Sequence, residues 1–209
     1  MNWEEFEKQH YGKEYWVDGK FSPYTGYPNT NSLTDLNIEF ANHYKIIKSV
    51  VPNITSIVEW GCATGEFLKL PKNEGVSVVG YELSSWCIEN KVIDEVSKLN
   101  ACECVCEDIA CADVHYSSHF MEHLPQEDIL PFLIKISKKC KYMVHVIPSY
   151  KFETNIPSQS HLTQINREWW INTFKKLDNF TLIEYPNKER QYIKTGNVEY
   201  VGAYILVKK

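Results

Sequence analysis

The chain has 209 residues, 44% of them hydrophobic and 23% charged, which suits one folded domain with a sizeable core. Its net charge of −5 at pH 7 gives no support for non-specific binding to nucleic acid, and its seven cysteines, an odd number, disfavour a secreted disulfide framework. The acidic start does not resemble a signal peptide, and no apolar run is long enough to cross a bilayer. We therefore predict a cytoplasmic protein.

Strands and helices are expected to alternate along the first half of the chain. Residues 1–32 are rich in tyrosine and tryptophan without sustained periodicity, which predicts an N-terminal extension. A helix with apolar residues at helical spacing follows from Ser32. Strands are predicted at 55–60 and 76–81, apolar on both faces as in a parallel sheet. A short helix lies between them and is expected to stop near Pro71.

The alternation continues to the C-terminus. A helix capped by Ser84 is expected to run to Leu99. The later elements are predicted in this order: strands at 101–106 and 112–118, a helix near 129–136, a strand at 142–147, a helix at 167–176, and strands at 180–185 and 200–207 that pair as a hairpin. We predict an α/β fold with a doubly wound, seven-stranded Rossmann-like sheet, in one domain over 1–209 whose core covers 33–209.

The third predicted strand alternates Cys102, Cys104 and Cys106. Side chains on one strand face stand about 6.6 Å apart at roughly 3.3 Å per residue. Two thiolates on one zinc ion, at about 2.3 Å each, lie no more than about 4.6 Å apart. We therefore expect small buried hydrophobic residues here rather than zinc ligands.

A glycine turn after the first strand carries the strongest functional signal. The strand ends in Gly61-Cys62-Ala63-Thr64-Gly65, and the next strand ends in Glu82. Glycine allows positive φ and close approach of the backbone to a ligand. An acidic residue about 20 positions after such a turn can accept hydrogen bonds from ribose hydroxyls. A glycine turn alone also serves to pack a helix on a strand, but the order and spacing of these elements favour a nucleoside site.

Glu59, directly before the turn, distinguishes between two kinds of cofactor. A dinucleotide site prefers Gly-x-Gly-x-x-Gly, with the pyrophosphate on the helix N-terminus. Here the turn is Gly-x-x-x-Gly, and a carboxylate beside it would repel a pyrophosphate. The same carboxylate suits a ligand that carries an ammonium and a sulfonium, which favours a sulfonium methyl donor over a nicotinamide.

With these features the chain resembles class I S-adenosylmethionine-dependent methyltransferases, of the small-molecule types 11, 12 and 23, from roughly residue 33 to the end. The resemblance implies S-adenosyl-L-methionine as cofactor and an antiparallel hairpin at the C-terminal edge of the sheet. The turn would hold the methionine part, Glu82 the ribose, Asp108 the adenine amino group, and Ser117 would lie beneath the sulfonium. The family usually has glycine where Ala63 stands. The implied cofactor-binding residues are Glu59, Gly61, Cys62, Ala63, Gly65, Glu82, Leu83, Asp108, Ile109 and Ser117.

Candidate catalytic groups follow the fourth predicted strand. Glu122-His123-Leu124 resembles the Glu-His-Leu segment of small-molecule methyltransferases, whereas the Asn-Pro-Pro-Tyr signature of base N-methylating enzymes is absent from the sequence. If a helical turn begins here, His119, Glu122 and His123 share one face. A general base at His119 or His123 is one interpretation. A structural Glu-His pair that closes the strand end is another.

A metal site is the third interpretation. The segment resembles the small-RNA 2′-O-methyltransferases and the ubiquinone-pathway catechol O-methyltransferases. There a Glu-x-x-Glu-His segment, with a further His in the RNA enzymes, holds a divalent metal that binds a vicinal diol. Here His119 replaces the first Glu, which favours manganese, iron or zinc over magnesium. The resemblance implies catalytic and metal-binding roles for His119, Glu122, His123 and His161.

We predict a methyltransferase that O-methylates a small molecule such as a sugar, a nucleoside or a catechol-like diol, with or without a divalent metal. The acidic balance disfavours nucleic acid as a partner, no membrane partner is expected, and the oligomeric state does not follow from the sequence. Two alternatives stay open. One is a methyltransferase that acts on RNA or protein, and the other is an inactive subunit that binds S-adenosylmethionine.

Overall fold

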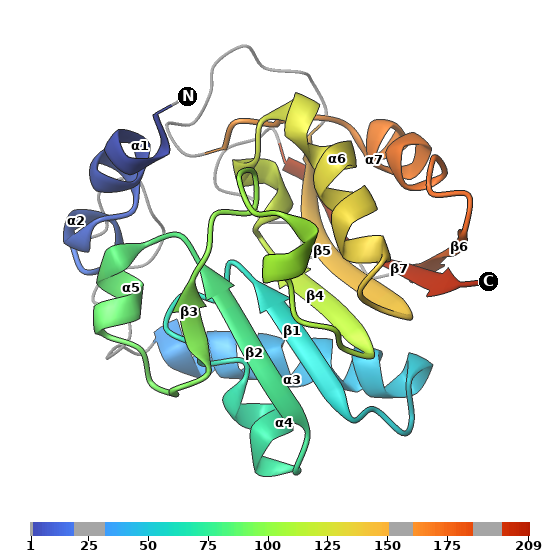
Figure 1. The fold of residues 1–209 in the computed structure, drawn as a ribbon, viewed down its shortest axis with the longest axis horizontal. Helices are drawn as coiled ribbons and strands as arrows, with labels where there is room; N and C mark the ends of the chain where they lie inside the picture. Colours follow the sequence, from blue (N-terminus) through green and yellow to red (C-terminus); the bar gives the residue numbers. More distant parts are fainter. Residues whose placement is uncertain (1, 19–31, 151–160, 186–197) are drawn as a thin grey trace. The chain divides into compact units, whose positions relative to one another are not determined.

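The computed structural model describes residues 2–18, 32–150, 161–185 and 198–209 (Figure 1). Its strands form a seven-stranded sheet in the order β3-β2-β1-β4-β5-β7-β6. The α/β fold with an antiparallel C-terminal hairpin is thus confirmed. The chain divides into two compact units, Met1–Asn100 and Ala101–Lys209. The single domain with an N-terminal extension stays a prediction. Within the described ranges, no helix combines the length and apolarity needed to cross a membrane.

Three parallel strands lie in the described residues of the first unit. Ser56 of β1 pairs with Ser77 of β2, and Gly80 of β2 pairs with Val96 of β3. β1 is buried over its last four residues, as expected for a strand that is covered on both faces. The elements of this unit are α1 (Trp3–His10), α2 (Lys13–Trp16), α3 (Ser32–Val50), β1 (Ser56–Trp60), α4 (Lys69–Asn73), β2 (Ser77–Glu82), α5 (Ser85–Glu89) and β3 (Val96–Lys98).

Tight packing presses the turn after β1 against β2. A Cβ atom built on Gly80 would lie 2.6 Å from Cys62 Sγ and 2.9 Å from Leu68 Cδ1. Leu68 and Phe67 are almost completely buried. Gly80 is therefore required by the close approach of the turn, and the position of the turn is fixed by the core of its own unit.

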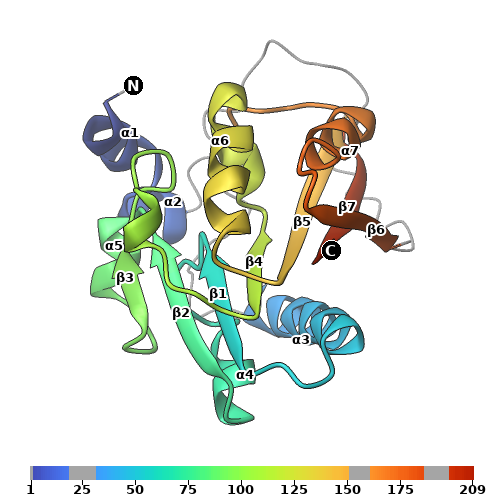
Figure 2. The same cartoon turned by 45° about the vertical axis from the view of Figure 1, so that its right-hand side comes forward.

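In the described residues of the second unit, strands β4 to β7 form the sheet and the α-helices are α6 and α7 (Figure 2). β4 and β5 are parallel, and β7 runs antiparallel to both β5 and β6. Helix α7 packs on the sheet through Phe174, whose ring stacks on His145 of β5 and contacts Tyr204 of β7. The elements are η1 (Cys106–Asp108), β4 (Val114–Ser118), η2 (Met121–His123), α6 (Gln126–Ser137), β5 (Tyr142–Tyr150), α7 (Arg167–Phe174), β6 (Phe180–Tyr185) and β7 (Val198–Lys208), where η marks a 3₁₀ turn.

The sequence pattern placed the third strand wrongly. The strand lies at Val96–Lys98, the preceding helix ends at Glu89, and residues 101–108 form turns instead of a strand. The backbone carbonyls of this segment are engaged by the ammonium of Lys135 on α6, so they do not need a neighbouring strand as partner. The expected alternation of cysteines on one strand face is therefore also wrong.

Candidate functional site

The turn after β1 holds three residues in the left-handed region. The φ angles of Gly61, Ala63 and Gly65 are 66°, 49° and 91°. Residues with a Cβ atom adopt this region at a cost of roughly 1–2 kcal/mol. Glycine therefore suits two of the positions, and Ala63 is strained at the place where the resemblance leads one to expect glycine. Gly65 also lacks room for a side chain, since a Cβ atom would lie 2.8 Å from Val96 Cγ2.

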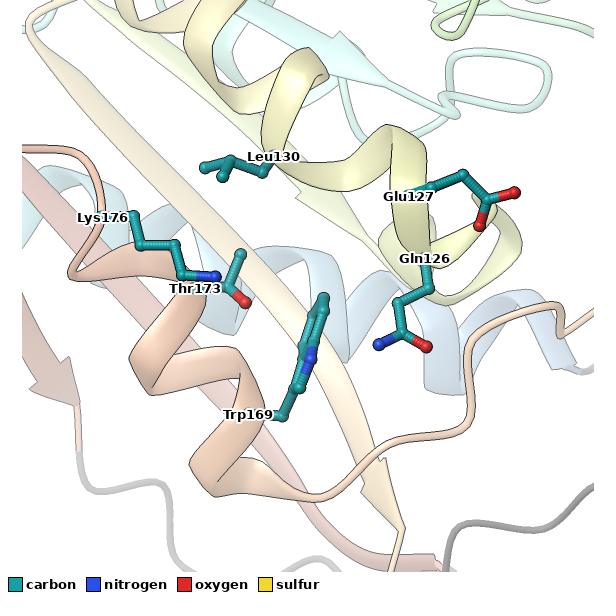
Figure 3. Close-up of a pocket in the computed structure, with 6 residues that line it drawn as sticks. All are labelled: Gln126, Glu127, Leu130, Trp169, Thr173 and Lys176. Carbon is teal, nitrogen blue, oxygen red and sulfur yellow. The ribbon is translucent and has the colours of Figure 1, made fainter.

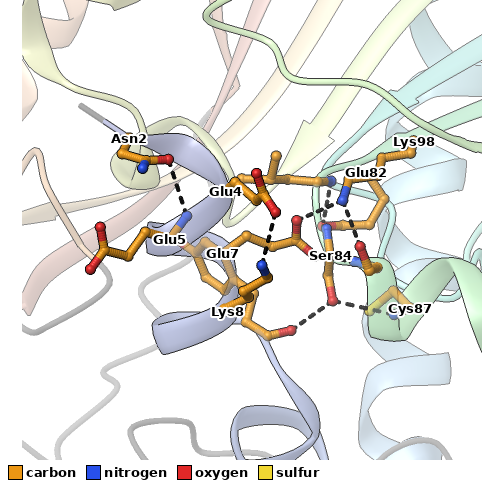
Figure 4. Close-up of polar contacts among 12 residues, drawn as sticks. Asn2, Glu4, Glu5, Glu7, Lys8, Glu82, Ser84, Cys87 and Lys98 are labelled. Atoms are coloured by element: carbon orange, nitrogen blue, oxygen red, sulfur yellow. Dashed lines mark hydrogen bonds and ion pairs between the residues drawn. The ribbon is translucent and has the colours of Figure 1, made fainter.

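The carboxylate of Glu82 closes this turn from the end of β2 (Figure 4). Its Oε2 accepts a hydrogen bond from the Ala63 amide at 2.9 Å. Its Oε1 accepts from the amides of Leu83 and Ser84 at 2.8 and 2.9 Å. Burial raises the pKa of Glu82, and these amides oppose that shift in part. A carboxylate offers about four lone-pair sites, so three amide donors leave one for a ligand hydroxyl.

Glu59 is a second buried carboxyl beside the turn, and it is 4% exposed. Its Oε2 atom has no hydrogen-bond partner within the described part of the chain. Burial, and then the charge of Glu82, raise the pKa of Glu59 well above its usual value. Burial and both carboxylates likewise raise the pKa of the Cys62 thiol. An unpartnered acceptor in a buried acidic pair fits a ligand that carries positive charge.

The N-terminal helices hold the loop that follows Glu82 (Figure 4). The Ser85 amide donates to Glu7 Oε1 at 2.5 Å, and Lys98 Nζ donates to Glu7 Oε2 at 2.6 Å. The Ser84 hydroxyl donates to the Tyr11 carbonyl at 2.7 Å. The sequence did not reveal Glu7 or Lys98 as part of the site, because no local pattern links residues so far apart in the chain.

The remaining predicted cofactor residues lie in the second unit. Asp108 is exposed in η1, where its Oδ2 accepts from the Val105 amide at 3.0 Å, and Ile109 is buried. Ser117 is fully buried on β4, and its hydroxyl is 2.8 Å from Nδ1 of His145, its register partner on β5. The Ser117 hydroxyl thus has an inter-strand partner, and a contact of this residue with the cofactor stays a prediction.

The turn η2 brings Glu122, His123 and His161 together. One ligand atom of each lies within 4.8 Å of the others, an arrangement that could hold a metal ion. Glu122 is fully buried, and neither of its carboxylate oxygens has a hydrogen-bond partner among the residues described. His119, predicted as a fourth member, is outside this group, although its Nδ1 lies 3.4 Å from Glu122 Oε1.

The cluster is anchored through the backbone. The Thr163 amide donates to the Glu122 carbonyl at 2.9 Å, and the Thr163 hydroxyl donates to the Leu124 carbonyl at 2.7 Å. These bonds join the segment that carries His161 to η2. His119 has a φ of 50°, which is unusual for a residue with a side chain and is often found at functional sites.

Tyr150 is a member of this site that the sequence did not reveal, since its predicted strand ended at residue 147. Its hydroxyl lies 2.6 Å from His161 Nδ1. Burial lowers the pKa of His161 to about 4, so the ring is neutral at pH 7. If Nδ1 donates to Tyr150, Nε2 carries the lone pair that a metal ion needs. Burial raises the pKa of Glu122, but the three histidines nearby outweigh it and the net shift is downward, so the group is a carboxylate.

A hollow of about 330 Å³ lies between α6 and α7 (Figure 3). Its wall on α6 begins three residues after His123. An aromatic face flanked by amide, carboxylate, hydroxyl and ammonium groups fits a polar molecule that contains a ring. The lining residues are Gln126, Glu127, Leu130, Trp169, Thr173 and Lys176.

No family model matches the chain, and no curated protein matches it, but many solved structures do. The N-terminal domain of EvdMO1 with SAH bound has a TM-score of 0.63 at 12% identity, over 100% of this chain and 97% of that one. A SAM dependent methyltransferase from Archaeoglobus fulgidus has a TM-score of 0.60 at 19% identity, over 83% and 94%. The chain shares the Rossmann-like fold of these structures.

The small RNA methyltransferase HEN1 has a TM-score of 0.59 at 14% identity and is matched over 81% of this chain. The chain spans only 25% of the length of that structure. At these identities the likeness extends to the fold, and assignment to the type 11, 12 and 23 methyltransferases stays a prediction.

Proposed function

We propose that the protein is a methyltransferase that uses S-adenosyl-L-methionine to methylate an oxygen atom of a small molecule. The observation that carries the proposal is the buried pair Glu59 and Glu82 on either side of a turn with three left-handed residues. The fold likeness to structures whose titles name methyltransferases and bound SAH supports it.

The residues present fit this cofactor. The unpartnered Glu59 Oε2 suits the ammonium of the methionine part, and the last lone-pair site on Glu82 suits a ribose hydroxyl. Two buried carboxyls would oppose a pyrophosphate, which argues against a dinucleotide. When bound, the cofactor supplies a methyl group on a sulfonium that needs no further activation, so the protein must align and deprotonate the acceptor.

Calorimetry with S-adenosylhomocysteine tests the proposal. Gly61→Arg, at a φ of 66° in the turn, is expected to abolish binding. Gly75→Arg is the matched control, because Gly75 has a φ of 82° and open space around its Cβ position. If the wild-type protein fails to bind the ligand, or if Gly61→Arg binds it as Gly75→Arg does, the proposal is wrong.

For the acceptor side we propose that Glu122, His123 and His161 hold a divalent metal that lowers the pKa of the acceptor hydroxyl. The two carboxylate oxygens of Glu122, which are buried without a hydrogen-bond partner in the described part of the chain, favour this, as does the support of His161 by Tyr150. Nitrogen and oxygen ligands in this mixture suit manganese, iron or zinc. Ligand atoms on one ion at about 2.1 Å lie at most about 4.2 Å apart, so binding requires a small inward rotation of these side chains.

Metal titration of the purified protein distinguishes this role from a general base. His161→Ala should abolish binding of Mn²⁺ or Zn²⁺, whereas His119→Ala, outside the group, should retain it. A chelator should then remove activity, and added metal should restore it. Activity that survives the chelator would leave His119 or His123 as a general base.

The hollow between α6 and α7 has room for a small polar acceptor with a ring. A screen of sugars, nucleosides and catechols for methyl transfer tests this directly. Turnover of RNA or a protein alone would favour the alternative acceptor classes. SAH binding without turnover of any acceptor would favour an inactive partner subunit.

A further inference from the structure

Helix α6 holds the turns between β3 and β4 through a single ammonium. Lys135 Nζ donates to the carbonyl oxygens of Ala101, Cys102 and Cys104 at 3.2, 3.4 and 2.9 Å. An ammonium has three donors, so this one segment can use all of them. Hydrogen bonds from a charged donor are roughly twice as strong as neutral ones.

Other contacts tie the same segment to the same helix. The Cys106 thiol lies 3.9 Å from the Lys135 carbonyl. Burial, and then the neighbouring Asp128 carboxylate, raise the pKa of the Cys102 thiol to about 12. Asp128 and Lys135 are seven residues apart, which is about two helical turns, so they lie on one face of α6.

The segment leads directly into two predicted cofactor residues. The turn η1 begins at Cys106, two residues after the last carbonyl that Lys135 binds. Asp108 Oδ2 caps this turn by accepting a hydrogen bond from the Val105 amide. The next residue, Ile109, is buried. The position of the Asp108 carboxylate therefore depends on where the preceding turns are held.

We propose that Lys135 is a positioning residue for adenine recognition. Its ammonium holds residues 101–108 in place and so presents Asp108 to the exocyclic amino group of the cofactor. The inference rests on the proposed function, because it needs an adenine at this edge of the second unit. Without the ammonium, the three carbonyls turn to water and the segment gains conformational freedom, which weakens contacts that depend on a fixed Asp108.

Hydrogen exchange tests the first half of the inference without any ligand. In Lys135→Met, amides of residues 101–108 should exchange at least about tenfold faster than in the wild type. Lys138→Met is the matched control, because Lys138 is an exposed lysine at the end of the same helix. Unchanged exchange in Lys135→Met, or an equal increase in Lys138→Met, would overturn the role of Lys135.

A ligand comparison tests the second half. S-adenosylhomocysteine has the adenine amino group, and S-inosylhomocysteine lacks it. The wild type and Lys138→Met should prefer the adenosyl ligand by about tenfold or more, as for one buried hydrogen bond to a charged group. Lys135→Met should reduce this preference to within about threefold, and adding Asp108→Ala should reduce it no further, as for residues that act as a unit.

Two outcomes separate the inference from the proposed function. A wild-type protein that binds neither ligand overturns the proposed function and the inference with it. A wild type that prefers the adenosyl ligand, together with a Lys135→Met variant that keeps the full preference, overturns the inference alone. Lys135→Gln, which keeps an amide donor, is measured in parallel, so a folding failure of Lys135→Met still leaves a variant for the comparison.

Discussion

The glycine turn of the first unit and the Glu122 cluster of the second are built in different ways. The turn is formed by contiguous residues, and its glycines indicate the backbone conformation in the sequence itself. Glu82 contacts the turn from the adjacent strand. The cluster joins η2 to the segment that contains His161 and Thr163, through side chains and one backbone hydrogen bond. The difference indicates that a backbone-made ligand site can be read from local sequence, whereas a side-chain-made site depends on the fold.

Low pH should lower the stability of the second unit more than that of the first, because His115 and His145 are buried in the second unit as neutral rings. Burial lowers the pKa of His115 to about 4 and that of His145 to about 3. Below the ordinary pKa of about 6.5 the unfolded chain binds protons that the folded chain does not, so stability is full above about pH 6.5 and falls as the pH drops toward the folded values. At about 1.4 kcal/mol per pKa unit, the loss amounts to several kcal/mol.

Denaturant unfolding from pH 7 to pH 4 measures this loss. His145→Gln should flatten the pH dependence, although it lowers stability at pH 7. If the variant shows the same slope as the wild type, His145 is not the buried neutral group.

The Glu122 cluster should respond in activity rather than in stability. His161→Ala is expected to lower kcat/KM by about 10²–10⁴-fold, the range for loss of a proton-transfer or metal-binding group. Tyr150→Phe should cost about 10–100-fold, as for a residue that orients a ligand. Steady-state kinetics with the acceptor that the protein methylates gives both values. An unchanged kcat/KM in His161→Ala would remove the cluster from the mechanism.

The glycine turn should respond to a single methyl group. Gly65→Ala adds strain at a φ of 91° and a contact of 2.8 Å with Val96, for a loss of about 2–4 kcal/mol. Gly75→Ala adds only the strain, about 1–2 kcal/mol, since its Cβ position is open. Urea unfolding of the two variants measures the packing part as their difference, and equal losses would contradict the tight fit of the turn.

Proton linkage should identify Glu59 as the group that meets the ligand ammonium. Because its pKa is raised by burial and by Glu82, a cationic ligand that favours the carboxylate should release up to about one proton on binding. The affinity should therefore rise with pH until Glu59 is ionised in the free protein. Calorimetry in two buffers of different ionisation enthalpy gives the proton count, and Glu59→Gln should reduce it to near zero.

Ala63→Gly should give the smallest change in the free energy of unfolding, and it should stabilise the protein where Gly65→Ala destabilises it. Relief of the left-handed strain gains roughly 1–2 kcal/mol, and the added chain entropy of glycine costs roughly 0.5–1 kcal/mol. We expect a net gain of about 0.5–1 kcal/mol in the free energy of unfolding, with ligand affinity unchanged or improved. A destabilised variant would show that the methyl group packs usefully despite the φ of 49°.

The sequence by itself determined the order of most elements, the C-terminal hairpin and the glycine turn with Glu82 beyond it. Hydrophobic periodicity and the conformational freedom of glycine are local properties, so they can be read along the chain. The same periodicity failed after Ser84, where the apolar spacing up to Leu99 suggested one long helix. There the helix stops at Glu89, and Val96 belongs to β3.

Only the tertiary structure decided how polar groups distant in the chain are paired. It joined Lys135 to the carbonyls of residues 101, 102 and 104, Ser117 to His145, and Tyr150 to His161. It also placed Glu122 between histidines with both of its carboxylate oxygens buried. Hydrogen bonding and burial depend on which elements pack against one another, and no local pattern of residues encodes that choice.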